Sequence, residues 1–178
     1  MSLPLAYVPP LTRAHLRFLN VLPLAQASDV TDLQQLELSP SAQRTLRRFL
    51  TVPGIRTGLL FGTRQGDLLR VHAVTLGSPD TIAPFALQPA YVLGLADAFG
   101  HLDATLDWVG HWITVPEDQC PDQAARLAWF KRAEALHLVT RDCPLLLAGW
   151  VEGQLQLCAL RAGDTRGDNC ELVVLESR

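Results

Sequence analysis

Two β-hairpin signals constrain the fold of this chain more than any other feature of its sequence. In the first, the short apolar segment 57–63 and the alternating segment Leu68–Leu76 are joined by a turn that contains glycine. In the second, segments Leu145–Val151 and 154–161 are joined by the tight turn Glu152-Gly153. Apolar runs of this length around a glycine turn are typical of paired antiparallel strands. The fold therefore has to bury two hairpins.

Three helices are expected beside these hairpins. The first follows Ser39-Pro40, which supplies an N-cap and a proline at the first helical position, and it ends before Pro53-Gly54. The second, Pro89–Leu102, is apolar nearly all round, which is typical of a buried helix. The third opens at Pro121-Asp122 and runs to about Ala135.

Single strands are predicted at 106–112, 136–141 and 170–175. The resulting order is helix, hairpin, helix, strand, helix and then a C-terminal meander, which predicts an α+β layered domain. Residues 1–35, punctuated by prolines, precede this pattern and are expected to form an N-terminal arm or appendage. The domain itself is expected to span 36–178.

The charge of the chain argues against a general nucleic-acid binder, because its net charge is −3 and phosphate neutralisation needs a basic surface. The charge is also uneven. Residues 1–70 carry eight arginines and four acidic residues, whereas 71–178 carry seven basic and fourteen acidic residues. The uneven charge has two alternative explanations. One is ordinary surface variation, and the other is complementary association between protomers or with a protein partner. Arg44, Arg47 and Arg48 are expected to form one positive helix face, which is either simply solvated or an interaction surface.

Several features bear on the compartment. The four cysteines contain no Cys-x-x-Cys pair, so neither a zinc ribbon nor a redox motif is indicated. The N-terminus lacks the basic and sustained apolar regions of a signal peptide, and no apolar run approaches the roughly 20 residues of a membrane span. Fourteen arginines against one lysine indicate a GC-rich bacterial genome. We therefore expect a cytoplasmic bacterial protein with free thiols and no membrane contact.

Four segments, in order along the chain, carry a resemblance to a known family. Segment 53–62 ends in Gly-Leu-Leu-x-Gly, segment 85–89 reads Phe-x-hydrophobic-x-Pro, segment 109–116 reads VGHWITVP, and segment 121–125 reads PDQAA. Each matches part of a motif of the JAMM/MPN metalloprotease family, so the chain resembles that family over roughly residues 36–162. The resemblance implies a JAMM/MPN-like (cytidine-deaminase-like) α+β fold, in which a mixed sheet is flanked by helices.

The same resemblance implies that the zinc chemistry of the family is absent. In the family, two histidines and an aspartate hold zinc, a glutamate takes a proton from the zinc-bound water, and a serine helps to stabilise the oxyanion. The corresponding positions here are, in that order, Ile113, Val115, Ala125, Ile55 and Asp122. Aliphatic side chains offer zinc no lone pair. No metal, cofactor or catalytic residue is therefore expected at these positions.

A metal-free member of this family is implied to be a pseudoenzyme that acts as a protein-interaction or scaffold module. It is implied to self-associate or to pair with another MPN domain. The alternative is a hydrolase with a relocated metal or acid/base site near His101, His111 and Glu117, although a lone strand histidine is more often structural. A nucleic-acid role for the arginine-rich first 70 residues is a third hypothesis.

Overall fold

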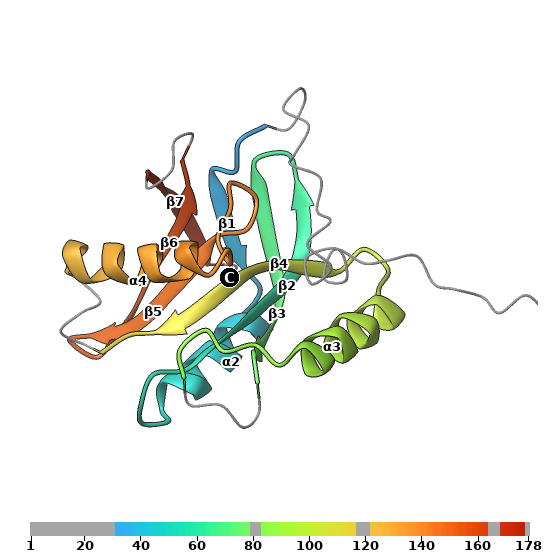
Figure 1. Ribbon diagram of the computed structural model, residues 1–178, viewed down its shortest axis with the longest axis horizontal. Helices are drawn as coiled ribbons and strands as arrows, with labels where there is room; N and C mark the ends of the chain where they lie inside the picture. The colour runs from blue at the N-terminus through green and yellow to red at the C-terminus, as the bar shows by residue number, and fades with distance from the viewer. Residues whose placement is uncertain (1–30, 79–82, 117–121, 164–167, 177–178) are drawn as a thin grey trace, which may run out of the picture.

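The computed structural model describes residues 31–78, 83–116, 122–163 and 168–176, which form a closed barrel of seven strands with three helices packed against it (Figure 1). The strands are β1 (Gln35–Leu38), β2 (Thr57–Gln65), β3 (Leu68–Leu76), β4 (Asp107–Thr114), β5 (Leu145–Val151), β6 (Gln154–Ala162) and β7 (Asn169–Glu176). The helices are α2 (Pro40–Leu50), α3 (Pro89–Leu102) and α4 (Gln123–Ala135). Around the barrel the order is β1-β3-β2-β4-β5-β6-β7.

The four-residue strand β1 closes the barrel. It pairs in parallel with β3, where Gln35 lies opposite Leu68, and in parallel with β7, where Gln35 lies opposite Val173. Leu36 and Leu38 are fully buried. Without β1, β3 and β7 would each expose an unpaired sheet edge. The strand begins at the last residue of the expected N-terminal arm, and the division of the chain at that point stays a prediction.

The barrel interior is apolar, and α2 packs against it. Every strand contributes to one buried cluster, which includes Leu38, Leu60, Val71, Val109, Leu146, Ala159 and Leu172. From α2, Ala42 and Leu46 join this cluster, and the ring of Phe49 stacks on Trp112 with 5.0 Å between centroids. The predicted cap is confirmed, since the Ser39 hydroxyl accepts a hydrogen bond from the backbone N–H of Ala42.

The other two helices cover separate parts of the outer surface of the barrel (Figure 1). Val92 and Ala96 of α3 pack against Phe61 of β2 and its neighbours. Phe130 and Ala133 of α4 pack in a cluster with side chains from β4, β5 and β6. The predicted bounds of α3 are confirmed, but its expected burial is wrong, because within this helix only Val92 and Ala96 are buried. Helix α4 begins directly after its cap, Asp122.

The strand predicted at 136–141 is wrong, because this segment ends α4 instead. His137 has a left-handed backbone with φ of 56°. The N–H of His137 donates to the carbonyl of Glu134 at 2.9 Å, and the N–H of Leu138 donates to the carbonyl of Ala133 at 3.0 Å. These two bonds form a Schellman motif, with histidine at the position that usually holds glycine. Leu138 then packs, partly buried, against the α4 cluster.

The predicted fold class, a JAMM/MPN-like mixed sheet flanked by helices, is also wrong. The described residues form a closed, mixed barrel in which sheet predominates over three short helices. The predicted layered domain treats the first hairpin and the C-terminal meander as parts of one open sheet. The parallel strand β1 joins the two instead, because it bonds to β3 on one side and to β7 on the other.

The structure also bears on the expected compartment. None of the helices in the described ranges is long and apolar enough to cross a membrane. Cys143, Cys158 and Cys170 are free thiols, and Cys120 lies outside the described residues. The cytoplasmic location stays a prediction.

Candidate interaction site

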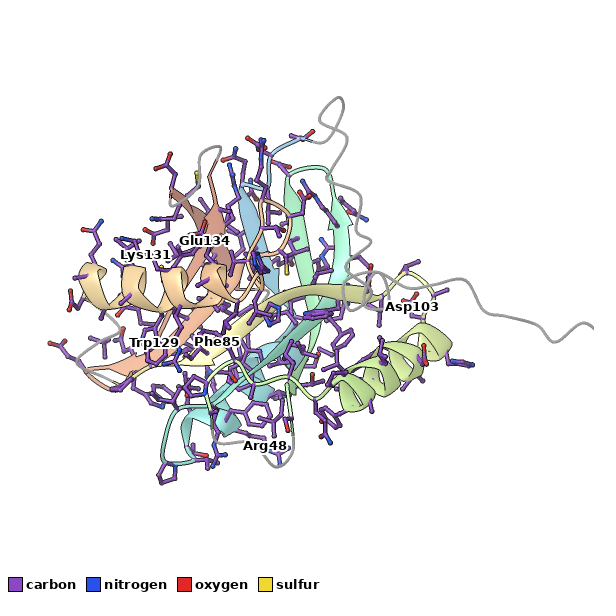
Figure 2. The ribbon with its side chains drawn as sticks, in the orientation of Figure 1. Arg48, Phe85, Asp103, Trp129, Lys131 and Glu134 are labelled. Carbon is purple, nitrogen blue, oxygen red and sulfur yellow. The ribbon has the colours of Figure 1, made fainter. Side chains whose placement is uncertain are left out.

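The outer face of α2 carries three exposed arginines. Arg44, Arg47 and Arg48 lie at positions i, i+3 and i+4, on the side of the helix opposite the buried Ala42 and Leu46. Arg48 is labelled at the lower edge of the molecule in Figure 2. Within the part of the chain that the structure describes, no ion pair joins these arginines to a carboxylate. We call these three residues the arginine face.

An open apolar pocket lies at the C-terminal end of the same helix. Its volume is about 300 Å³. Its walls come from the end of α2, the loop before β2, the end of β4 and the end of β5. The lining residues are Leu50, Val52, Pro53, Gly54, Ile55, Thr114, Val115, Pro116 and Trp150. We call this cavity the α2 pocket.

The described lining of the α2 pocket is mostly apolar. None of its nine lining side chains is an acid or a base that titrates near neutral pH. The Thr114 hydroxyl already accepts a hydrogen bond from the backbone N–H of Arg56 at 2.7 Å. Val52 is 41% exposed and Trp150 is half-buried, so apolar surface at the pocket remains open to solvent. The pocket can therefore bury an apolar group, and its described lining residues include no ionisable side chain that could transfer a proton near neutral pH.

The arginine face and the α2 pocket adjoin each other. Arg47 lies one helical turn before Leu50, which lines the pocket, so their side chains are neighbours on the helix surface. Arg47 and Arg48 also lie in the last turn of α2, where positive charge stabilises the helix dipole. Arg44 lies in the middle of the helix, beyond the reach of that effect. The surface thus presents an apolar cavity with positive charge along one side.

Three of the positions that match the lost zinc chemistry come together in the fold. Ile113 is fully buried and Val115 is 5% exposed, and both belong to the cluster beneath α4, against which Ile55 packs. Ile55 and Val115 also line the α2 pocket. Ala125 lies in the first turn of α4, partly buried. The carboxylate of Asp122 is exposed and caps that helix by accepting from the backbone N–H of Ala124 at 2.9 Å.

The residues of the alternative hydrolase site have different surroundings. His101 is exposed at the end of α3, where its ring nitrogen Nδ1 lies 2.8 Å from the carbonyl oxygen of Asp97. His111 is 1% exposed in β4, and its ring meets that of Trp108 edge to face at 5.0 Å. Glu117 lies outside the described residues. In the ranges that the structure describes, no three histidine, cysteine or acidic side chains are grouped closely enough to bind a metal ion.

A second, smaller pocket lies between α4 and β7, next to Cys158. Its volume is about 60 Å³, and Arg126 and Glu171 line it. The Sγ atom of Cys158 accepts a hydrogen bond from Arg126 at 3.2 Å and lies 3.5 Å from a carboxylate oxygen of Glu171. Burial raises the pKa of Cys158 to about 11, and the hydrogen bond from Arg126 offsets only part of that effect. The thiol is therefore protonated near neutral pH and is a poor nucleophile.

The sequence alone indicated the arginine face but not the α2 pocket. The pocket unites residues near 50–55, 114–116 and 150, and no local pattern links these segments. Trp150 lies near the end of the predicted strand Leu145–Val151, and nothing in that local pattern shows that it lines an open cavity. The proline and glycine at 53–54 mark the loop at the pocket rim, and they were the one local signal of an irregular surface there.

Comparison with known proteins identifies a structure with a similar fold but does not assign the chain to a family. No protein-family model matches the chain, and no curated protein matches it significantly. The solution structure of protein DSY2949 from Desulfitobacterium hafniense is similar, with a TM-score of 0.57 and 13% sequence identity over 80% of this chain and 93% of that chain. Identity this low shows a shared fold alone. This likeness does not indicate a JAMM/MPN domain.

Proposed function

We propose that this protein is a non-catalytic interaction module that binds the acidic surface of a protein partner through the arginine face of α2. The observation that carries the proposal is the exposure of Arg44, Arg47 and Arg48 on one side of a helix whose other side is anchored in the barrel. A fixed helix presents its charges without the entropy cost of ordering a loop. Positive charge on such a surface speeds and orients encounter with an acidic partner.

The helix dipole alone does not account for this face. It explains a preference for positive charge at Arg47 and Arg48, whereas Arg44 lies too far from the C-terminal end of α2 to benefit. A solvated face with no partner would also tolerate acidic residues, but α2 contains none. The apolar α2 pocket beside the arginines supports an interaction surface further, because open apolar cavities are where partners gain most of their binding energy.

The identity of the partner divides into two cases, self-association and a different protein. Residues 71–178 carry a net charge of −7, so a second copy is one candidate for the acidic surface. Size-exclusion chromatography with light scattering separates the two cases at low salt. A dimer that dissociates as salt rises would identify the second copy as the partner, because screening weakens contacts between exposed charges.

The proposal is tested by co-purification from the native host with two matched charge reversals. The double variant Arg47→Glu/Arg48→Glu reverses the arginine face, and Lys131→Glu/Arg132→Glu reverses two adjacent exposed basic residues on α4. Proteins enriched by the wild-type chain should be lost from the first variant and kept by the second. Identical sets of partners for both variants would contradict a role for the arginine face.

A further inference from the structure

We infer that the α2 pocket receives one large apolar side chain from an acidic segment of a different protein. The inference rests on the proposed function, because it uses the arginine face to bring that segment to the pocket. It specifies the chemistry of the bound segment. Its acidic side chains lie along α2, and its apolar side chain enters the pocket at the C-terminal end of that helix.

The size of the pocket indicates what fits. Its volume of about 300 Å³ lies at the lower end of the range for small-molecule sites, which is roughly 300–1,000 Å³. The cavity is therefore small for a cofactor or a long acyl chain, and large enough for an aromatic or leucine-sized side chain. Interface anchors of this kind fill such pockets and account for most of the binding energy.

The lining of the pocket suits an apolar anchor. Seven of the nine lining residues are aliphatic, aromatic or proline, and the Thr114 hydroxyl is engaged with the backbone of Arg56. These side chains offer few hydrogen bonds to a polar group, whereas an apolar group gains free energy by leaving water there. Half-buried Trp150 supplies a broad apolar wall of the kind enriched at binding hot spots.

Charge complementarity selects the acidic segment over a neutral one. Arg47 neighbours Leu50 at the pocket, and Arg48 and Arg44 continue the positive charge along α2. An extended or helical segment whose apolar side chain enters the pocket therefore runs past one or more guanidinium groups. Asp and Glu side chains on that segment would pair with them in bidentate geometry.

The test is a selection of random peptides displayed on phage against the full-length chain, followed by fluorescence anisotropy with the enriched peptides. We expect enriched sequences that combine acidic residues with one large apolar residue. Replacing that residue by serine should weaken binding by about tenfold or more. Raising the salt from about 50 mM to about 500 mM should weaken it further, because screening reduces the attraction of the arginines.

Variants of the protein then locate the site. Val52→Glu places a negative charge at the pocket rim, and Trp150→Ala removes a wall, and each should weaken binding by about tenfold or more. Val173→Glu makes the same change as Val52→Glu at an apolar residue of β7 that is 60% exposed and does not line the pocket. This control should bind like the wild type. Circular dichroism and thermal unfolding check that each variant is folded. If Trp150→Ala does not fold, Val52→Glu alone tests the pocket.

The outcomes separate the inference from the proposed function. Peptides that lose binding to Arg47→Glu/Arg48→Glu but bind Val52→Glu normally would overturn the pocket while supporting the arginine face. Peptides that depend on Val52 and Trp150 but not on the arginines would overturn the acidic segment. Failure to enrich any peptide with the expected composition would overturn the inference as a whole. A dimer in light scattering that Val52→Glu dissociates would show a second copy in the pocket, and would overturn a separate partner segment.

Discussion

The indole nitrogen of Trp112 donates a hydrogen bond to the carbonyl oxygen of Thr75 at 2.8 Å, and the bond passes directly over Gly58. Trp112 lies on β4 and Thr75 on β3, so the bond spans β2, the strand between them. A Cβ atom at Gly58 would lie 1.8 Å from the oxygen of Thr75 and 2.6 Å from the indole nitrogen. This glycine belongs to the Gly-Leu-Leu-x-Gly segment that carried the family resemblance. Its presence follows from packing inside this barrel.

Replacing Gly58 by alanine should destabilise the fold by about 1–3 kcal/mol, because either the indole or the β3 backbone has to move. The matched control is Gly94→Ala in α3, where nothing lies within 4 Å of the added Cβ. That change should be neutral or stabilise the protein by about 0.5–1 kcal/mol, since alanine is the better helix former. Urea unfolding measures both. Equal stability of the two variants would contradict the close approach at Gly58.

The closing strand β1 should be essential to stability despite its length. Leu38 is fully buried in the barrel interior, and Leu38→Ala should cost about 2–5 kcal/mol in the free energy of unfolding. Leu102, which is 82% exposed at the end of α3, provides the control, and Leu102→Ala should leave the midpoint of unfolding nearly unchanged. If Leu38→Ala were as stable as Leu102→Ala, β1 would not be part of the folded barrel.

Asp32 should make stability depend on pH below neutrality. The hydrogen bond from Arg141 lowers the pKa of Asp32 below its ordinary value of 3.8, and the charges of Arg141, Arg161 and Arg64 lower it further. A lowered pKa means that the carboxylate stabilises the fold above pH 3.8, and that this contribution is lost as the pH falls through the native pKa. Asp32→Asn should therefore lower the melting temperature slightly at pH 7, because the pair is exposed, and the difference from wild type should vanish in strong acid. If the difference in melting temperature between Asp32→Asn and wild type were the same at pH 7 and in strong acid, the ion pairs of Asp32 would not be its cause.

Cys158 should resist alkylation in the folded protein. Because burial raises its pKa to about 11, iodoacetamide near neutral pH should modify partly exposed Cys170 first and reach Cys158 only after unfolding, as peptide mass spectrometry would show. The raised pKa also sets a pH window. The thiol favours the native state below its ordinary pKa of 9.0, and that contribution is lost as the pH rises toward about 11. The stability of wild type relative to Cys158→Ala should fall across that interval.

His137 offers a stabilising substitution. Its left-handed backbone is unfavourable for any residue with a Cβ, so His137→Gly should stabilise the protein by about 1 kcal/mol. His101→Gly is the matched control, because His101 lies within the regular last turn of α3, where glycine should cost about 0.5–1 kcal/mol. Opposite signs in thermal unfolding are expected. Destabilisation by both changes would mean that the side chain of His137 contributes more than its backbone conformation costs.

The sequence determined the local elements of this protein. The capped helix after Ser39-Pro40, the apolar helix Pro89–Leu102 and the two hairpins were all predictable, because near neighbours specify caps, turns and helical stripes. The spacing of Arg44, Arg47 and Arg48 likewise placed them on one exposed helix face. The strand predicted at 136–141 was wrong because the left-handed turn in this segment has histidine at the position where glycine is the usual signal of a helix end.

The tertiary structure decided the closure of the barrel and the α2 pocket. Gln35 pairs with Leu68 and with Val173, and parallel pairing over such separations leaves no turn signature in the sequence. A four-residue strand also gives almost no periodic pattern of its own. The pocket depends on the same long-range assembly, since it joins the end of α2 to Val115 and Trp150. Neighbouring residues encode helices and hairpins, whereas contacts between distant segments form only when the whole apolar interior is buried together.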